Sequence, residues 1–244
     1  MNKFTVAAIV IIVACFGGLV AWSTLRDEGK AIDYSKYNSQ SIIEGTDDNG
    51  NIADHVRGKA DSKVIVLEYA DVQCPGCATM MPRMTILHRQ YGDRVAFVFR
   101  NFPINGHQNA RAASAACESA GFQGYFWDML ETLYSNRADW VDATGSKRTD
   151  IFANLFKEIA PDGDVEKFRA DLNDANIEKK INFDYGLGRN VDKVDGTPSV
   201  FVNGEKMNMD DGTFDDVVKR VEDKINSELE KNGERTGPNE TEEE

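Results

Sequence analysis

Two cysteines separated by two residues follow an aliphatic run in the stretch Val64-Ile65-Val66-Leu67-Glu68-Tyr69-Ala70-Asp71-Val72-Gln73-Cys74-Pro75-Gly76-Cys77. The aliphatic residues 64–67 do not alternate with polar ones, which is typical of a central strand buried on both faces. A helix is predicted over residues 77–91, and residues 95–99 have the composition of a second buried strand. Strand, helix and strand follow one another as in a βαβ unit, so an α/β fold is predicted.

The spacing of Cys74 and Cys77 suits thiol–disulfide exchange. That reaction needs a thiolate that attacks and a second thiol close enough to resolve the mixed disulfide. At a helix N-terminus the first turn brings the two sulfurs together, while free N–H groups and the helix dipole stabilise the first sulfur as an anion. We therefore expect Cys74 to be the exposed nucleophile and Cys77 the buried resolving thiol. Pro75 fits the first turn, where its missing N–H costs nothing.

Two other roles for this pair are open. The Cys-x-x-Cys spacing also occurs in zinc sites, which would need two further ligands. Cys15 lies in the apolar N-terminal stretch, and His88 and His107 lack a ligand-like pairing. A purely structural disulfide is the other alternative. The position of the pair after a buried strand and before a helix favours redox chemistry without a metal.

The N-terminal segment 1–25 is predicted to be a single-pass signal anchor in the cell membrane, with the catalytic domain outside the cytoplasm. Its uncharged run over residues 4–25 is long enough to span the hydrocarbon core of a bilayer as a helix. Two alternatives are a cleaved signal peptide and lipid attachment at Cys15, because residues 12–15 resemble a lipobox. All three interpretations of the N-terminal segment place the domain outside the cytoplasm. A polar, turn-rich tether is expected over residues 26–50.

A long helical block follows the βαβ unit. Residues 108–188 show helical periodicity and predict an inserted helical subdomain. We expect Cys117 to be a small buried apolar residue of this block. The core of the block is expected to include its aromatic cluster, which consists of Phe122, Tyr125, Phe126 and Trp127.

The β pattern resumes after this block. Residues 199–202 read as a strand, and Asn203-Gly204 signals a hairpin leading into residues 206–209. An amphipathic helix is predicted over residues 213–231. The last segment, residues 232–244, is expected to be an acidic, disordered tail.

The charge and the cysteine count exclude two classes of protein. The formal net charge of −13 argues against a partner made of nucleic acid, because a phosphate backbone demands a basic face. Four cysteines, one of them in the apolar N-terminal run, cannot form a disulfide framework for a chain of 244 residues. The cysteines therefore comprise one working pair and two residues outside it.

Several motifs together resemble the DsbA-like thiol oxidoreductases, which are membrane-associated members of the thioredoxin superfamily with a Cys-Pro-x-Cys pair. The stretch 67–77 is similar to the active-site strand and helix start of that family. Pro82 stands at the kink position of the thioredoxin active-site helix. Phe102-Pro103 and then residues 107–110 resemble the entry into the family's helical insertion, and residues 196–204 resemble its cis-proline loop and hairpin.

This likeness spans residues 54–225. It implies an α/β thioredoxin fold over residues 51–231, with a central mixed β-sheet and an inserted all-helical subdomain. It also implies the activity of a protein thiol:disulfide oxidoreductase. The redox-active disulfide Cys74–Cys77 would be its only redox group, with no metal and no other cofactor.

The resemblance also implies roles for single residues. A cis Thr197-Pro198 bond would lie beside the cysteines and leave the Thr197 backbone free to pair with an extended substrate chain. Glu68 would be a partly buried acid that relays the proton of Cys77, whereas the alternative places Glu68 at a solvated edge. Gly76 stands where the family often has histidine, and it offers no side chain to the Cys74 sulfur.

Three functions follow as hypotheses. The Cys-Pro-x-Cys pair resembles the oxidising branch of the family, so we expect a dithiol oxidase that introduces disulfides into unfolded exported proteins. The family implies that a membrane quinone-linked thiol oxidoreductase recycles it. The alternatives are a disulfide reductase or isomerase, and a non-catalytic module that binds partners through the helical insertion.

Overall fold

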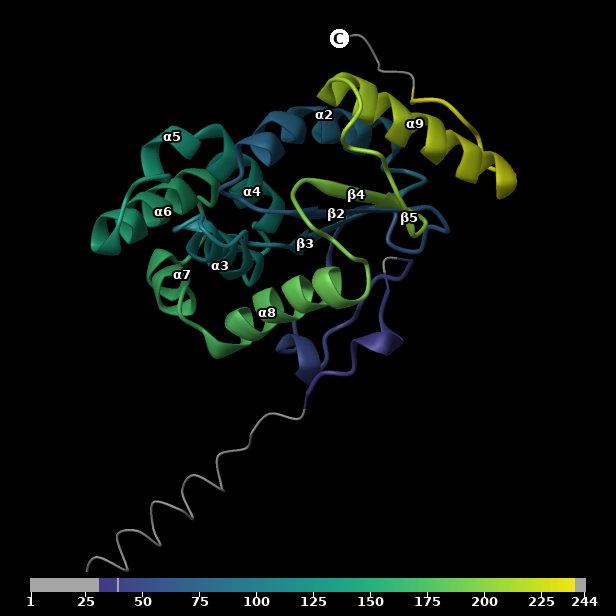
Figure 1. The fold of residues 1–244 in the computed structure, drawn as a ribbon. Coiled ribbons are helices and arrows are strands. Elements are labelled where there is room, and N and C mark those ends of the chain that lie inside the picture. The colour runs from purple at the N-terminus through teal and green to yellow at the C-terminus, as the bar shows by residue number, and fades with distance from the viewer. Residues whose placement is uncertain (1–30, 39, 240–244) are drawn as a thin grey trace, which may run out of the picture. The chain divides into compact units, whose positions relative to one another are not determined.

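The structure is a computed structural model that describes residues 31–38 and 40–239. The chain divides into two units, Met1–Asp33 and Tyr34–Glu244. All helices and strands given below belong to the second unit. Figure 1 shows them coloured along the chain from purple to yellow.

The predicted membrane segment lies outside these residues. The same holds for the alternative of lipid attachment at Cys15, so the structure tests neither. Within the described ranges, no helix combines the length and the apolar character that a membrane crossing requires. The extracytoplasmic placement of the domain therefore stays a prediction.

One mixed sheet forms the centre of the second unit. Its described strands are, in spatial order, β1 (His55–Gly58), β3 (Ala96–Asn101), β2 (Ile65–Ala70), β4 (Ser199–Val202) and β5 (Glu205–Lys206). β2 and β3 run parallel, and the helix α2 (Pro75–Tyr91) connects them. The other neighbouring strands pair antiparallel. The predicted βαβ unit and mixed sheet are confirmed.

Both faces of the sheet are covered. Leu67 and Tyr69 of β2 point into a core on the side of α8 (Ala175–Asn190). Val66 points to the opposite face, into a core closed by α2 and α9 (Phe214–Lys231). Figure 1 shows α2 and α9 on one side of the strands and α8 on the other. Since side chains of a strand alternate between two buried faces, its aliphatic run shows no alternation of apolar and polar residues.

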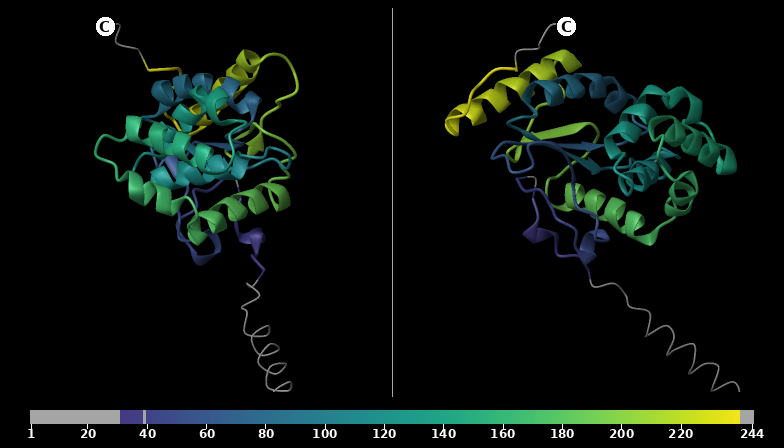
Figure 2. Two further views of the ribbon diagram at one scale, coloured as in Figure 1. Left: turned by 90° about the vertical axis from the view of Figure 1, so that its left-hand side faces the viewer. Right: turned by 180° about the vertical axis from the view of Figure 1, so that it is seen from behind.

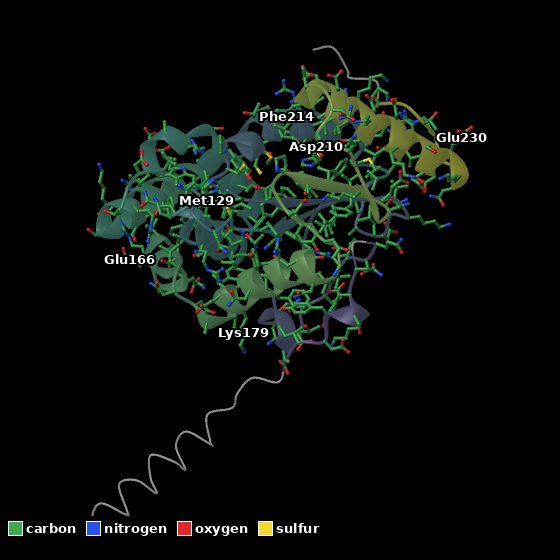
Figure 3. The ribbon with its side chains drawn as sticks, in the orientation of Figure 1. Met129, Glu166, Lys179, Asp210, Phe214 and Glu230 are labelled. Atoms are coloured by element: carbon green, nitrogen blue, oxygen red, sulfur yellow. The ribbon has the colours of Figure 1, made fainter. Side chains whose placement is uncertain are left out.

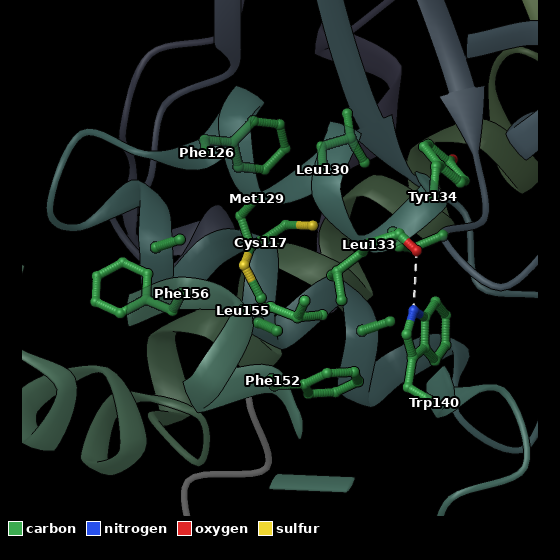
Figure 4. Close-up of a cluster of buried hydrophobic side chains, with 14 of the residues drawn as sticks. Cys117, Phe126, Met129, Leu130, Leu133, Tyr134, Trp140, Phe152, Leu155 and Phe156 are labelled. Carbon is green, nitrogen blue, oxygen red and sulfur yellow. Dashed lines mark hydrogen bonds between the residues drawn. The ribbon is translucent and has the colours of Figure 1, made fainter. Parts of the chain in front are cut away.

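The inserted helices pack at one end of the sheet (Figures 1 and 2). They precede α8 and are α3 (Ala110–Gly121), α4 (Phe126–Ser135), α5 (Arg137–Trp140), α6 (Gly145–Ile159) and α7 (Val165–Asp171). Figure 4 shows their buried core, in which the Trp140 ring N–H donates to the Leu133 carbonyl at 2.9 Å. The same buried cluster continues to Cys74 and Cys77. The insertion therefore packs directly against the cysteine pair.

The expectation for the aromatic cluster holds only in part. Phe126 is buried, and Tyr125 and Trp127 are partly buried against the same core. Phe122, in contrast, is 40% exposed. It follows the last residue of α3, where the chain turns outward, and the Lys167 ammonium lies 5.4 Å from the centre of its ring.

The expected tether packs against the domain from Tyr34 onward. This segment contains the short 3-10 helices η1 (Tyr34–Lys36) and η2 (Asp47–Asn49). Ile43, which lies between them in the sequence, is buried. The ring of Tyr37 meets Phe183 of α8 edge-on, with ring centroids 4.9 Å apart. A few well-placed side chains thus hold a segment whose composition is mostly polar.

The C-terminal segment differs from the prediction in the same way. The Arg94 guanidinium donates to the carbonyl oxygens of Arg235 at 2.6 Å and Gly237 at 3.0 Å, and to the Asn239 side chain at 2.9 Å. The first part of the predicted tail is therefore held on the domain. The predicted hairpin strand over residues 206–209 is shorter than expected, because β5 ends at Lys206.

A group of buried charges ties the helix α8 to the sheet. The Lys180 ammonium lies 2.9 Å from a carboxylate oxygen of Asp54 and 2.9 Å from one of Asp184. Arg100 of β3 pairs with the same Asp54 at 2.7 Å, and the side chains of all four are fully buried. Removing one member of such a group leaves an uncompensated charge in the interior.

We expect Lys180→Met to lower the free energy of unfolding by about 3–5 kcal/mol, because Asp54 and Asp184 lose their shared cation. Chemical denaturation of the reduced protein measures this difference. Lys206→Met is the matched control: Lys206 pairs with Asp195 at the surface, so its loss should cost less than about 1 kcal/mol. Equal effects of both substitutions would contradict the role assigned to Lys180.

Candidate active site

Cys74 is the N-cap residue of α2. Its backbone is extended, with φ −65° and ψ 127°, and Pro75 occupies the first helical position, as the sequence suggested. Cys74 is buried, with 8% of its surface exposed, so the expectation of an exposed nucleophile is wrong. Cys77, one turn further into the helix, is buried more completely. The N–H groups of the first turn, which have no partner within the helix, therefore face the Cys74 sulfur.

Several donors converge on this sulfur and lower the pKa of Cys74 to about 5. The largest effect is the hydrogen bond from the Cys77 thiol, and the backbone N–H groups of Cys77 and Gly76 add to it. Burial of the Cys74 thiol acts in the opposite direction. At neutral pH the group is therefore a thiolate, the form that attacks a disulfide.

Thr197 contributes from the opposite loop. Its carbonyl oxygen accepts a hydrogen bond from the protonated Cys74 thiol at 3.5 Å. Its hydroxyl is buried without a hydrogen-bond partner among the described residues, and the Thr197 side chain also lowers the pKa of Cys74. A thiolate at this position supplies the acceptor that the buried hydroxyl otherwise lacks.

Cys77 experiences the opposite influences. Burial raises the pKa of this thiol well above the ordinary value for cysteine. Its hydrogen bond to Cys74 and the negative charges of Cys74 and Glu68 raise it further. The pKa values of the two thiols are therefore shifted in opposite directions. Cys74 is ionised at neutral pH, while Cys77 keeps its proton.

Glu68 lies in β2 and is buried on the face that carries Val66, so the alternative of a solvated edge is wrong. Burial, followed by the charge of Cys74, raises the pKa of Glu68 to about 8. At neutral pH the carboxyl is therefore mostly protonated. A group with this pKa can give a proton to a neighbouring sulfur or take one from it.

The loop before β4 faces the start of α2. The Thr197–Pro198 peptide bond is cis, as the resemblance implies. A Cβ atom placed on Gly76 would lie 3.4 Å from the Pro198 ring and 3.6 Å from both the Cys74 sulfur and the Phe214 ring. A side chain at this position would therefore contact the Cys74 sulfur, Pro198 and Phe214, and glycine leaves this space open.

An open groove of about 650 Å³ runs from this point along the loop after β5. Gly76, Thr197 and Pro198 lie at one end, and Met207, Met209 and Phe214 supply its apolar lining. Phe214 and Asp210 lie near each other at the start of α9 (Figure 3). Polar and charged residues such as Lys206 and Asp210 complete the lining, and the groove reaches the start of α2 at Gly76.

The histidines take other places. His88 is buried and meets the rings of Phe97 and Trp127 edge-on. Burial, followed by the charge of Arg57, lowers its pKa to about 3. His107 faces the carboxylate of Asp71, three residues before Cys74. In the described part of the chain, no cluster of three or more His, Cys, Asp or Glu side chains is arranged to hold a metal ion.

Sequence reasoning gave little weight to the residues that hold the cysteine loop in place. The carboxylate of Asp71 and the side chain of Gln73 connect this loop to the start of the insertion. Arg137 of α5 reaches the Gln73 carbonyl at 2.6 Å. The only signal in the sequence was the presence of polar residues between a buried strand and a cysteine pair.

The family model described as Thioredoxin matches residues 50–223. The chain belongs to the thioredoxin family. It is 29% identical over 235 residues to the probable disulfide bond formation protein D of Bacillus cereus, covering 91% of this chain and 94% of that protein. With this match, the chain is a DsbA-like thiol:disulfide oxidoreductase.

Solved structures share its fold. The oxidised BdbD from Bacillus subtilis superposes with a TM-score of 0.60 at 22% identity, covering 80% of this chain and all of that one. DsbA from Xylella fastidiosa gives a TM-score of 0.57 at 19% identity, covering 70% of this chain and 88% of the other. The DsbA-like thioredoxin fold expected from the sequence is therefore confirmed.

We expect Cys77→Ala to raise the pKa of Cys74 by roughly one pH unit or more, because the thiolate loses its strongest hydrogen-bond donor. The ultraviolet absorbance of the thiolate, followed through a pH titration of the reduced protein, measures the change. Cys117→Ala removes a buried thiol of the insertion core and should leave the Cys74 titration where it is. An unchanged titration in Cys77→Ala would contradict the assigned hydrogen bond.

Proposed function

We propose that this protein is a dithiol oxidase that works outside the cytoplasm and donates a Cys74–Cys77 disulfide to unfolded exported proteins. The observation that carries the proposal is the position of the Cys74 sulfur at the start of α2, where hydrogen-bond donors converge on it and lower its pKa to about 5. Stabilising the thiolate of the reduced form favours reduction of the pair, which makes its disulfide a stronger oxidant. The name of the Bacillus cereus relative, a probable disulfide bond formation protein, supports the same direction.

The proposed reaction has two exchange steps. A substrate thiolate attacks the Cys74 sulfur, the bond between Cys74 and Cys77 breaks, and Cys77 leaves with the electron pair. A second substrate thiolate then attacks the substrate sulfur of the mixed disulfide, and Cys74 leaves as a thiolate. The substrate loses two electrons and gains a disulfide, while the enzyme pair becomes reduced.

Glu68 is proposed to donate a proton to the leaving Cys77 sulfur in the first step. The leaving Cys77 sulfur is buried and its pKa is strongly raised, so it needs a proton as it departs. Glu68 is buried on the same side of the sheet as α2, and its charge contributes to the raised pKa of Cys77. Its protonated carboxyl can supply this proton, and its carboxylate can recover it when the pair is oxidised again.

The cis-proline loop is proposed to hold the substrate. Thr197 and Pro198 lie beside the Cys74 sulfur at the end of the groove. An extended substrate segment could pair with the Thr197 backbone and place an apolar side chain against Met207, Met209 or Phe214. An unfolded protein offers such segments, whereas a folded protein buries them.

Turnover requires an oxidant for the reduced pair. We propose a membrane quinone-linked thiol oxidoreductase as the partner, as the resemblance implies. The N-terminal segment would keep the domain at the same membrane, where the recycling partner lies. Both parts of this proposal rest on the family resemblance and on the apolar run over residues 4–25.

The direction of the reaction is tested by equilibrating the full-length protein in detergent with glutathione. We expect a reduction potential well above that of thioredoxin, which is about −270 mV, because the reduced form is stabilised. A value near that of thioredoxin would point to the reductase.

Catalysis itself is tested with Cys74→Ser, which should reduce oxidation of a reduced, unfolded model protein to the uncatalysed rate. Equal rates for the wild-type protein and the variant would support the non-catalytic module.

The proton relay is tested with Glu68→Gln, which keeps the shape of the side chain and removes its acid function. We expect disulfide donation to slow by roughly tenfold or more below pH 8. The ratio of wild-type to variant rates should fall toward one at higher pH, where Glu68 has lost its proton. Burial, the larger cause of its raised pKa, also acts in the oxidised form, in which the Cys74 thiolate charge is absent. Stopped-flow mixing with a reduced peptide measures both rates. Glu205→Gln, at the exposed strand β5, is the control, and a pH-independent ratio would contradict the relay.

A further inference from the structure

Asp71 is a hub of hydrogen bonds directly after β2. Its carboxylate is fully buried and accepts from the backbone N–H groups of Gln73 and Ile104, both at 2.7 Å. One carboxylate oxygen also lies 2.7 Å from Nδ1 of His107. Since a carboxylate only accepts, Nδ1 carries the hydrogen in this pair.

The backbone of Asp71 contacts both halves of the active site. Its carbonyl oxygen accepts the N–H of Cys74 at 2.9 Å and the hydroxyl of Tyr134 at 3.3 Å. Its own N–H faces the Cys77 sulfur and partly opposes the rise of the Cys77 pKa. A shift of this one residue would therefore move the cap of α2 and a donor to the second sulfur together.

The next residues extend the same connection. The side-chain oxygen of Gln73 accepts the backbone N–H of Asn109, the N-cap residue of α3, at 2.7 Å. The carbonyl of Gln73 accepts from Arg137 of α5 at 2.6 Å. The segment between β2 and Cys74 is thus held on one side by the loop before α3 and on the other by α5.

We infer that Asp71 and His107 form a positioning pair for the redox reaction, which holds the backbone before Cys74 in the geometry that its sulfur chemistry requires. Neither side chain has a hydrogen bond to a cysteine sulfur among the described residues, so the pair acts through the backbone of Asp71. His107 comes from the loop that opens the insertion, so the insertion thereby contributes to the chemistry of the pair. This inference rests on the thiol chemistry of Cys74 and not on the direction of the proposed oxidase.

A second pair in the same molecule offers a matched control. Nε2 of His55 lies 2.7 Å from a carboxylate oxygen of Glu118, which is as fully buried as Asp71. This pair joins β1 to α3, and its hydrogen bonds lead to Asn101 rather than to the cysteine loop. Loss of either histidine removes one histidine–carboxylate contact. Only the contact of His107 involves the segment directly before Cys74.

The test compares His107→Leu, His107→Asn and His55→Leu in the full-length protein. We expect His107→Leu to raise the pKa of Cys74 by roughly one pH unit, which is a tenfold loss of thiolate stability. His107→Asn should restore most of it, because the asparagine amide can donate where Nδ1 does. His55→Leu should lower stability in denaturant and leave the Cys74 titration unchanged. Equal Cys74 titrations in all three variants would overturn the inference.

A measurement on the wild-type protein covers the case in which His107→Leu does not fold. Coupling between two sites is reciprocal, so a change in the redox state of the cysteines should alter the environment of the His107 ring. We expect the ring nitrogen signals of His107, followed by nuclear magnetic resonance, to differ between the oxidised and reduced protein. The signals of His55 should not differ. Identical signals of His107 in both states would overturn the inference, while the oxidase proposal would still be decided by the glutathione equilibrium.

Discussion

The thiolate of Cys74 depends on hydrogen-bond donors that converge on one sulfur at the start of α2. The Cys77 thiol, the first N–H groups of the helix and the Thr197 side chain all favour the anion, and together they outweigh the cost of its burial. These donors come from two distant parts of the chain. The fold satisfies this requirement by pairing β4 with β2, which places the cis-proline loop opposite the helix start.

Burial disfavours the Cys74 anion, and it also raises the pKa of the neighbouring groups Cys77 and Glu68. Cys77 is buried more completely than Cys74, and both Cys77 and Glu68 keep their protons more tightly than they would in water. A charge on any one of the three raises the cost of a charge on the others, so the site prefers to hold a single negative charge at the Cys74 sulfur, where the donors converge. The separation of nucleophile and proton carrier thus follows from burial of all three groups together with the hydrogen-bond donors at Cys74 alone.

The sequence predicted the parts of this site that lie close together in the chain. The aliphatic run and the cysteine pair identify β2 and the start of α2, because the buried strand and the spacing of the cysteines are local features. The strand β1 was missed, since its four residues contain a single aliphatic side chain, Val56, at the edge of the sheet. The contact between Asp71 and His107 joins positions 36 residues apart, and only the packed insertion brings them together. Burial of Glu68 likewise depends on helices that cover the sheet.

The position of Cys117 has a consequence for an enzyme that handles disulfides. A spare thiol within reach of Cys74 could capture the mixed disulfide or lock the enzyme in a wrong internal pairing. Cys117 is fully enclosed in the insertion core, and burial raises its pKa far above that of an accessible cysteine. Its thiol therefore keeps its proton, and a protonated thiol is a poor nucleophile. The core of the insertion therefore keeps this third thiol unreactive toward the disulfides that the enzyme handles.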